Sequence, residues 1–415
     1  MVVWIGFLAL SLTVWCQARI DVRLWGSVLT PGVVLMFGYA AISFIYAVAS
    51  VIYEMADVGV YTYLFLIFAS LMLIFVSLSV RHIFRYRRIA MYSGEVVTSK
   101  NFVLYAVISI AILYSILAVY ISLSNGGLWS SEAKDALSSG LPAHIHVMLS
   151  FAIVYYSANT LDGERSRFFW LGVFLIVLSL YPVKGWILIT LVAVFFSLRF
   201  KRLANLDVSK PNLFFPIISL VIGGVFVFFF IYLARVDLLN FDKDILLGTF
   251  IEIFQHFVFY LTASFAGLNS VIYGLRLPGD LEVIFAPVAN IVHYLFGEEY
   301  IKVISNIYHE SILGYQDGGN VFSYFGTLIG YLGLVGGVVF GILVIGLIYL
   351  FFGLAIFTKS KALFATSFYI VAVLSFGWFD YYFMLLTPYE VFLIGCFVLI
   401  VEFLTRHIKI SRIAT

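Results

Sequence analysis

The chain has 415 residues, of which 63% are hydrophobic and only 11% are charged. Soluble domains carry about 25% charged residues, so this composition excludes an ordinary soluble domain and indicates a membrane protein. The net charge of +2 gives no reason to expect a nucleic-acid partner. The two cysteines, Cys16 and Cys396, lie in or beside apolar runs, which predicts neither a disulfide framework nor a metal site.

Apolar segments long enough to cross a membrane recur along the whole chain, which predicts an all-α polytopic bundle. We expect one integral membrane domain over residues 1–415, with a large extracytoplasmic loop at 234–323. The first segment lacks a basic n-region and a cleavage site, so it is expected to be a retained span and not a signal peptide. About eleven transmembrane helices are expected, at residues 2–16, 26–52, 58–80, 102–123, 143–160, 168–181, 186–199, 213–233, 324–357, 362–380 and 388–404.

Basic residues are unevenly distributed over the loops that join these spans. One set of loops holds 18 of the 24 Lys and Arg residues, and the other set holds six. Because basic residues accumulate on the cytoplasmic side of a membrane, the first set is predicted to be cytoplasmic. An odd number of spans then places the N-terminus outside and the C-terminus in the cytoplasm.

Leu246–Tyr273 is apolar enough to suggest a twelfth span, but two observations argue against a crossing. A crossing would invert every later loop and place the basic C-terminus outside. The segment also carries Glu252 and His256, which recur with Tyr260 every four residues and so share one helical face. Such polar groups are costly in lipid, so we expect a helix that lies in, or dips into, the outer leaflet.

Three of the six basic residues expected outside are candidates for an anion site. Lys184 occupies a sharp turn between two spans, Arg235 follows a span directly, and Arg276 lies in the turn-rich passage 274–279. Arginine offers planar, two-pronged donors that fit phosphate oxygens, so these side chains can bind a lipid pyrophosphate. The alternatives are a snorkelling lysine and, for the arginines, ion pairs with the acidic residues Asp237, Asp242, Asp244 or Asp280.

His309 and Glu310 are the main candidates for acid–base chemistry. Either side chain can act as general base on a sugar hydroxyl, and a solvated loop pair is the alternative. No HExxH motif follows and no second ligand has metal spacing, so no zinc site is predicted. His256 with Glu252 is a rival acid–base pair. Asn320 is expected either to anchor the loop or to contact a sugar.

One passage carries a resemblance to a known family. Gly319-Asn-Val-Phe-Ser323 is followed by Tyr331-Leu-Gly-Leu-Val-Gly336, and the glycines here predict close helix packing within the membrane. With the many spans, the Lys-Gly outer turn and the large outer loop, this passage resembles the bacterial O-antigen polymerases of the Wzy type, the oligosaccharide repeat unit polymerases. Their pattern is N-V-F-T followed by Y-x-D-F-G. Ser323 stands where Thr is usual, and Gly333-Leu334-Val335 replaces the Asp-Phe-Gly.

The resemblance implies a GT-C-like glycosyltransferase that needs no cofactor and no metal ion. Its donor would be a growing glycan on undecaprenyl pyrophosphate, and its acceptor a lipid-linked repeat unit whose hydroxyl attacks the donor's anomeric carbon. The three basic residues named above would hold the pyrophosphate, Asn320 would contact the substrate, and His309 or Glu310 would accept the proton. Membrane lipid and a chain-length regulator protein are further expected partners, in lipopolysaccharide or related polysaccharide biosynthesis at the bacterial inner membrane.

Two rival functions stay open. An O-antigen ligase has a similar architecture, and the sequence alone separates it poorly from a polymerase. A lipid-linked oligosaccharide flippase or another transporter would place ionisable groups near the membrane midplane and show repeated halves. Asp380 and Glu390 fall near span ends, and no internal repeat is visible, which favours the polymerase.

Overall fold

The computed structural model describes residues 2–53, 55–84, 100–127, 130–159, 165–180, 184–204, 243–279, 281–301, 321–358 and 360–413. All regular elements in these residues are helices, and no strand occurs among them. The protein is therefore an all-α membrane protein. Seven of the described helices are long and apolar enough to cross a membrane, namely α1 (Val2–Trp25), α2 (Pro31–Ile52), α3 (Val60–Ile83), α4 (Lys100–Ser124), α6 (Gly140–Asn159), α12 (Ser323–Thr358) and α14 (Leu386–Ile413).

The other helices are shorter or less uniformly apolar. They are α5 (Ser131–Leu137), α7 (Arg165–Leu178), α8 (Lys184–Ala204), α10 (Lys243–Ile272), η2 (Leu281–Phe285), α11 (Ala286–Phe296), α13 (Lys361–Ser375) and η3 (Tyr382–Met384). Ten of the expected spans coincide with a helix, and the remaining one, 213–233, lies outside the described residues. The total number of membrane crossings stays a prediction.

The chain forms two compact units whose segments alternate along the sequence. Unit 1 contains residues 1–85, 232–350 and 373–386, and unit 2 contains residues 86–231, 351–372 and 387–415.

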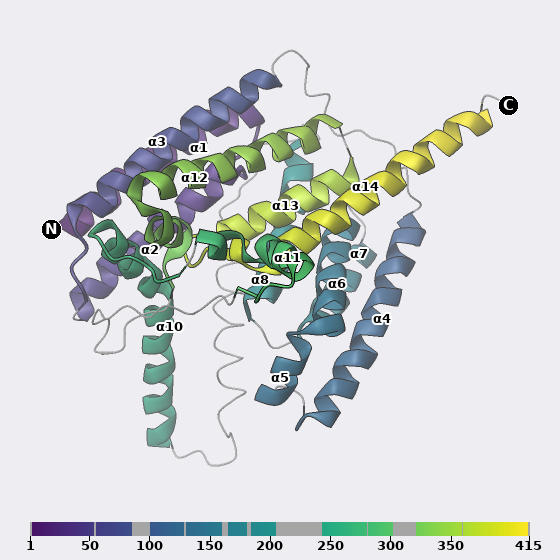
Figure 1. The fold of residues 1–415 in the computed structure, drawn as a ribbon, viewed down its shortest axis with the longest axis horizontal. Helices are drawn as coiled ribbons and strands as arrows, with labels where there is room; N and C mark the ends of the chain where they lie inside the picture. The colour runs from purple at the N-terminus through teal and green to yellow at the C-terminus, as the bar shows by residue number, and fades with distance from the viewer. Residues whose placement is uncertain are drawn as a thin grey trace. The chain divides into compact units, whose positions relative to one another are not determined.

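In unit 1, α1 packs against α2 and α3, and α1 and α3 lie side by side in Figure 1. The apolar pattern predicted that the first span ends at residue 16, but α1 continues to Trp25, so Asp21 lies inside the bundle and is fully buried. The Asp21 carboxylate accepts hydrogen bonds from the hydroxyls of Thr30, Ser77 and Tyr349, the last two over 2.5 and 2.7 Å. These donors offset much of the cost of removing the carboxylate from water, which explains how a polar residue extends an apolar helix.

In unit 2, α6 packs against α4, α7 and α8. A second buried carboxylate, Glu402 of α14, is 4% exposed and binds the N-terminal end of α13 through hydrogen bonds. It accepts hydrogen bonds from the Ser360 hydroxyl (2.7 Å), the Ala362 backbone N–H (3.1 Å) and the Tyr155 hydroxyl (2.9 Å). A negative charge at a helix N-terminus is favourable, so Glu402 has a structural role.

Candidate functional site

α12 is interrupted at one residue. Gly333 has φ 77° and ψ 168°, whereas the rest of Ser323–Thr358 is helical. The segment therefore consists of a ten-residue half-helix, 323–332, and a longer helix, 334–358. Ten helical residues are about 15 Å long, which is only half of the hydrocarbon core of a bilayer. The single span expected at 324–357 is thus two helices.

The longer helix runs back along the half-helix. The Tyr324 hydroxyl donates to the Gly341 carbonyl over 2.8 Å, although 17 residues separate them. A Cβ on Gly337 would lie 2.6 Å from the backbone nitrogen of Ile329. In a straight helix these residues would be about 12 Å apart along the axis, so the chain reverses direction at Gly333. The backbone of the longer helix thus packs directly against the half-helix at Gly337.

The bend leaves the last carbonyls of the half-helix without their usual helical donors. Arg276 Nη1 donates to the Ile329 carbonyl over 2.9 Å, and the Leu277 backbone N–H donates to the Gly330 carbonyl over 3.2 Å. Non-helical backbone inside a membrane protein persists only where such groups are satisfied by protein or water. The turn at 276–277 therefore caps the half-helix, and one member of this cap is a charged side chain.

The beginning of the half-helix is capped as completely. The four backbone N–H groups of residues 323–326 donate over 3.2, 2.5, 3.1 and 3.3 Å, in that order, to the Phe379 carbonyl, the Gly377 carbonyl, the Tyr39 hydroxyl and the Ser323 Oγ. A helix N-terminus binds an anion through free N–H groups. Because all four donors have protein partners, this N-terminus is not an anion site.

Arg276 lies at the end of unit 1 where α2 ends and α3 begins, which we call the Gly59 end. Asn269 of α10 accepts hydrogen bonds from the Gly59 backbone N–H (3.0 Å) and the Thr62 hydroxyl (2.8 Å), and the Tyr273 ring lies against Gly59. Arg276 follows Tyr273 by three residues and is exposed. Among the described residues, the cap uses one of the five N–H donors of Arg276, and these donors are of the kind that binds phosphate oxygens.

The opposite end of the half-helix lies deep in unit 1. The Tyr39 hydroxyl donates to Ser323 Oγ over 3.0 Å, and the Trp378 ring packs on Gly38. Gly38 and Tyr39 lie in the middle of α2, about 10–12 Å from its start and about 20 Å from its end. The non-helical linker 376–381 therefore meets the half-helix within unit 1, beside the middle part of α2, and the linker carries Asp380.

Asp380 differs from the two carboxylates described above. Its Oδ1 accepts a hydrogen bond from the Tyr381 backbone N–H over 2.7 Å. Within the described residues this is the only hydrogen bond that Asp380 accepts, and no basic side chain there forms an ion pair with it. Ionisable groups within a membrane bundle are costly and are functional candidates by default. Asp380 was expected near a span end, and it lies in the linker that begins where α13 ends at Ser375.

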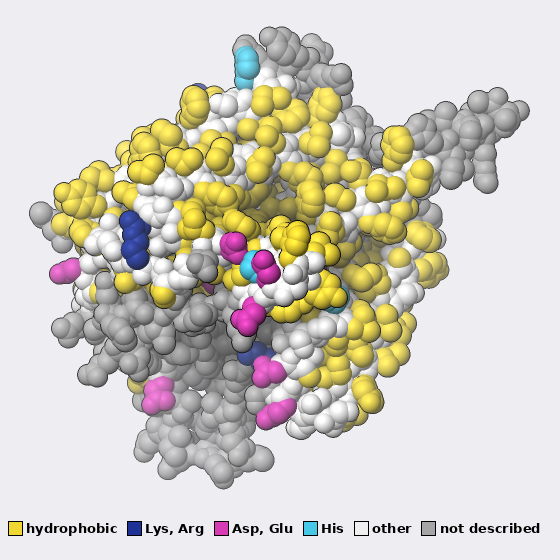
Figure 2. All heavy atoms as spheres, viewed as in Figure 1, with side chains coloured by type: hydrophobic (Ala, Val, Ile, Leu, Met, Phe, Trp, Pro, Cys, Tyr) yellow, Lys and Arg dark blue, Asp and Glu magenta, His cyan; other side chains and the backbone are white. Residues whose placement is uncertain are grey.

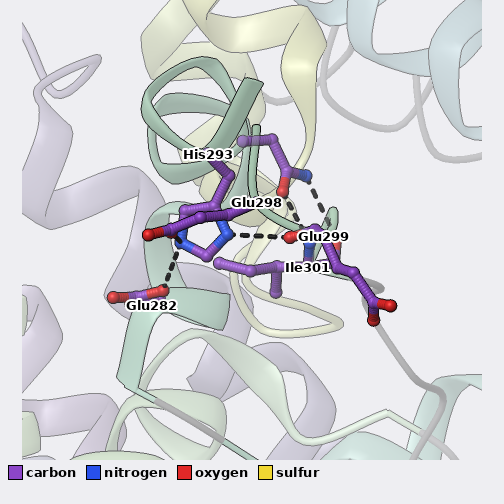
Figure 3. A network of polar contacts seen from close by, with 6 residues as sticks. Glu282, His293, Glu298, Glu299 and Ile301 are labelled. Carbon is purple, nitrogen blue, oxygen red and sulfur yellow. Dashed lines mark hydrogen bonds and ion pairs between the residues drawn. The ribbon is translucent and has the colours of Figure 1, made fainter. Parts of the chain in front are cut away.

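A third polar cluster lies on η2 and α11 (Figure 3). His293 Nε2 lies 3.0 Å from a carboxylate oxygen of Glu282 and 3.5 Å from one of Glu298, and Nδ1 lies 2.8 Å from the Glu299 carbonyl. The hydrogen bond with the Glu299 carbonyl, together with the hydrogen bond and negative charge of Glu282 and the charge of Glu298, raises the pKa of His293. His293 thus lies between acidic groups. The Asn290 side chain forms two hydrogen bonds with the backbone of Ile301 and so links α11 to the segment that follows it.

Of the predicted site residues, Arg276 alone has a described side chain. Lys184 begins α8, but its side chain lies outside the described part of the structure. The remaining predicted residues, Arg235, His309, Glu310 and Asn320, lie outside the described residues. The described residues contain no cluster of His, Cys, Asp or Glu able to hold a metal ion.

The sequence pattern predicted no role for Tyr39 and placed Asp380 near the end of a span. Tyr39 gives little signal, because it lies within an apolar run that reads as an ordinary span. Asp380 is followed by the aromatic residues Tyr381, Tyr382 and Phe383. A carboxylate between two apolar segments, with no Lys or Arg nearby, could have indicated a special position.

These observations define the class of the protein. It is a polytopic all-α membrane protein in which α12 is discontinuous, and neighbouring segments cap both ends of the half-helix 323–332. The chain belongs to the family of unknown function DUF6337, whose model matches residues 42–410. The half-helix, Arg276, His293 and Asp380 all lie within the matched region. The comparisons with curated proteins and with solved structures gave no match.

Proposed function

We propose that the protein is a glycosyltransferase that polymerises undecaprenyl pyrophosphate-linked oligosaccharide repeat units into O-antigen or a related surface polysaccharide. The observation that carries this proposal is the position of Arg276 at the bend of α12. The bend falls in the passage that resembles the polymerase motif, and Arg276 is an exposed cation directly against it. The hydrogen bond to the Ile329 carbonyl holds this cation at the bend. A cation with a fixed position can stabilise the negative charge of a leaving group that must be held in one place.

The orientation of the protein follows from its charges. The excess of Lys and Arg on one set of loops places that set in the cytoplasm, with the N-terminus outside and the C-terminus inside. In this orientation the bacterial inner membrane is crossed about eleven times, in a GT-C-like architecture, and the Gly59 end faces outward. Arg276 then lies near the depth of a lipid pyrophosphate, whose polyprenyl chain anchors it at the membrane surface.

The proposed reaction forms one glycosidic bond. A hydroxyl oxygen of the acceptor repeat unit attacks the anomeric carbon of the donor glycan, and the bond from that carbon to the pyrophosphate oxygen breaks. The pyrophosphate leaves with the bonding electron pair, and His309 or Glu310 takes the hydroxyl proton. Arg276, with Lys184 and Arg235, stabilises the charge that grows on the leaving group, and Asn320 contacts the sugar. No metal ion or cofactor takes part in this scheme.

Deletion of the gene tests the proposal in cells. A strain that lacks the polymerase should make surface glycan with a single repeat unit or accumulate single lipid-linked units. Long chains that persist in the deletion strain would contradict a sole polymerase. Loss of even the single-unit product would indicate the ligase or the flippase instead. Altered chain lengths on removal of a chain-length regulator would support the expected partnership.

Transport of a lipid-linked oligosaccharide is the second candidate, and one observation favours it. Asp380 lies in the non-helical linker that caps the start of the half-helix, and transporters build substrate and ion sites from discontinuous helices within the membrane. Flipping of fluorescent lipid-linked oligosaccharide in proteoliposomes distinguishes the two functions, because a polymerase catalyses bond formation without moving the substrate across the bilayer.

A further inference from the structure

α11 exposes its apolar face and turns its small and polar residues inward. Leu295 and Phe296 are 74% and 75% exposed, and Ile291 is 58% exposed. Val288 and Val292 are also exposed. In η2, which directly precedes α11, Leu281 and Phe285 are exposed as well. Residues 288, 291, 292 and 295 recur at helical spacing, so they form one stripe along the helix. We call these seven side chains the α11 face.

The other side of α11 contacts the protein. Ala286 and Ala289 are buried, which lets the helix backbone approach its neighbours closely. Asn290 donates to the Ile301 carbonyl and accepts from the Ile301 N–H, and His293 contacts Glu282. An amphipathic helix of a water-soluble domain has the reverse arrangement, with its apolar stripe inside. The α11 face therefore requires an apolar environment outside the chain.

The place of α11 in unit 1 indicates which environment that is. η2 packs against η3, and Gly279 just before η2 lies beside Tyr331, close to the bend of α12. The helices of the same unit expose apolar side chains along their lengths, for example Leu64 and Phe75 of α3. In Figure 2, acidic side chains and a histidine gather over α11, with hydrophobic side chains directly beside them. The α11 face thus belongs to the same unit as helices whose exposed apolar side chains belong in lipid, and lipid is the apolar environment that this unit offers.

We infer that η2 and α11 lie in the plane of a membrane interface, with the α11 face in the acyl chains of one leaflet. His293 and the glutamates then lie at headgroup level, and the stacked rings of Tyr294 and Tyr300, 6.5 Å apart, lie at the same boundary. Aromatic rings of this kind favour the interface. Residues 281–301 contain three glutamates and no Lys or Arg, so attachment rests on apolar burial and not on anionic lipid.

Site-directed spin labelling tests this placement in the full-length protein. Cys16 and Cys396 are first replaced by alanine, and single cysteines are introduced at Leu295 and, as the matched control three residues later, at Glu298. Each labelled protein is placed in phosphatidylcholine nanodiscs, and collision with oxygen is compared with collision with a water-soluble nickel chelate. The Leu295 label should collide at least several-fold more with oxygen than with nickel, and the Glu298 label should show the reverse preference.

The same labels identify the other outcomes. A Leu295 label as accessible to nickel as the Glu298 label would overturn the placement, because the face would be in water. A Leu295 label shielded from both reagents, with disulfide-linked dimers of the Leu295→Cys variant, would also overturn it, because a second copy would cover the face. A cysteine at Ile291 repeats the measurement if the Leu295 variant is poorly folded. None of these readouts depends on glycosyltransferase activity.

Discussion

Arg276 Nη1 donates to the Ile329 carbonyl over 2.9 Å, four residues before the φ of the chain becomes positive at Gly333. The same guanidinium lies 3.4 Å from the position where a Cβ of residue 333 would be. One side chain thus satisfies the backbone group that the bend exposes and also packs against the residue that makes the bend. A structural and a binding role for Arg276 therefore have to be separated by experiment.

The bend should depend on glycine at position 333. Gly333→Ala forces an L-residue to adopt φ 77° and ψ 168°, a region used almost only by glycine, which costs roughly 1–3 kcal/mol, and the added Cβ also presses on the Arg276 guanidinium. Thermal unfolding of the detergent-solubilised protein should shift to lower temperature. Gly172→Ala in α7 is the control, because nothing lies within 4 Å of the added Cβ and its backbone is helical. An unchanged melting temperature for Gly333→Ala would contradict the bend.

The reversal of the chain makes a second, independent prediction. Gly337→Ala places a Cβ 2.6 Å from the backbone of Ile329, and backbone atoms cannot move aside as a flexible side chain can. Overpacking of this kind typically costs about 1–3 kcal/mol. Gly346→Ala in the same helix is the matched control, because its Cβ would meet Val76 at an ordinary 3.6 Å. Equal stability of the two variants would show that the longer helix does not fold back on the half-helix.

Hydropathy predicts most of the helices but could not predict this reversal. Leu328-Ile-Gly-Tyr-Leu-Gly-Leu334 reads as one uninterrupted apolar run, and glycines are frequent in straight transmembrane helices. What determines the bend is the cap supplied by Arg276 and Leu277, which lie 53 residues before the carbonyls that they cap, and no local pattern shows that contact. The apolar pattern likewise ended the first span too early, because it cannot show that Asp21 finds three donors within the bundle.

Loss of charge at Asp21 and at Asp380, two carboxylates of unit 1, should affect the stability of the protein differently. Asp21→Asn replaces an acceptor of three hydrogen bonds, and hydrogen bonds to charged groups contribute about 1.5–3 kcal/mol each, so the variant should be clearly destabilised. Asp380→Asn removes a charge that has one described hydrogen bond, so stability should be unchanged or higher. Urea or thermal unfolding measures both variants. A large loss of stability in Asp380→Asn would show a structural role and remove Asp380 from the functional candidates.

The His293 cluster should loosen as the pH rises. The Glu299 carbonyl and the nearby glutamates raise the pKa of His293 in the folded protein above the value of about 6.5 expected in the unfolded chain. His293 therefore has a higher pKa in the folded protein than in the unfolded chain. Its protonation contributes fully to the stability of the folded cluster at pH values below the unfolded pKa. This contribution is lost as the pH rises through the folded pKa.

Hydrogen exchange in residues 281–301 measures this effect, after correction for the intrinsic pH dependence of exchange. Protection should be stronger at pH 5.5 than at pH 8.5, and His293→Gln should remove the difference. A pH-dependent protection that persists in His293→Gln would assign the titration to another group.

The polymerisation assay with purified Arg276 variants tests the proposed function most directly. Wild-type protein supplied with lipid-linked repeat units should produce a ladder of lengthened glycans, and the absence of a ladder would contradict the polymerase itself. Arg276→Gln keeps an N–H donor for the Ile329 carbonyl but removes the charge, whereas Arg276→Lys keeps the charge without the two-pronged geometry. If Arg276 holds the pyrophosphate, Arg276→Gln should lower the rate by about 10²–10³ and Arg276→Lys should retain part of it, with both variants folded normally. Near wild-type polymerisation by Arg276→Gln would show that Arg276 only caps the half-helix and that the leaving group binds elsewhere.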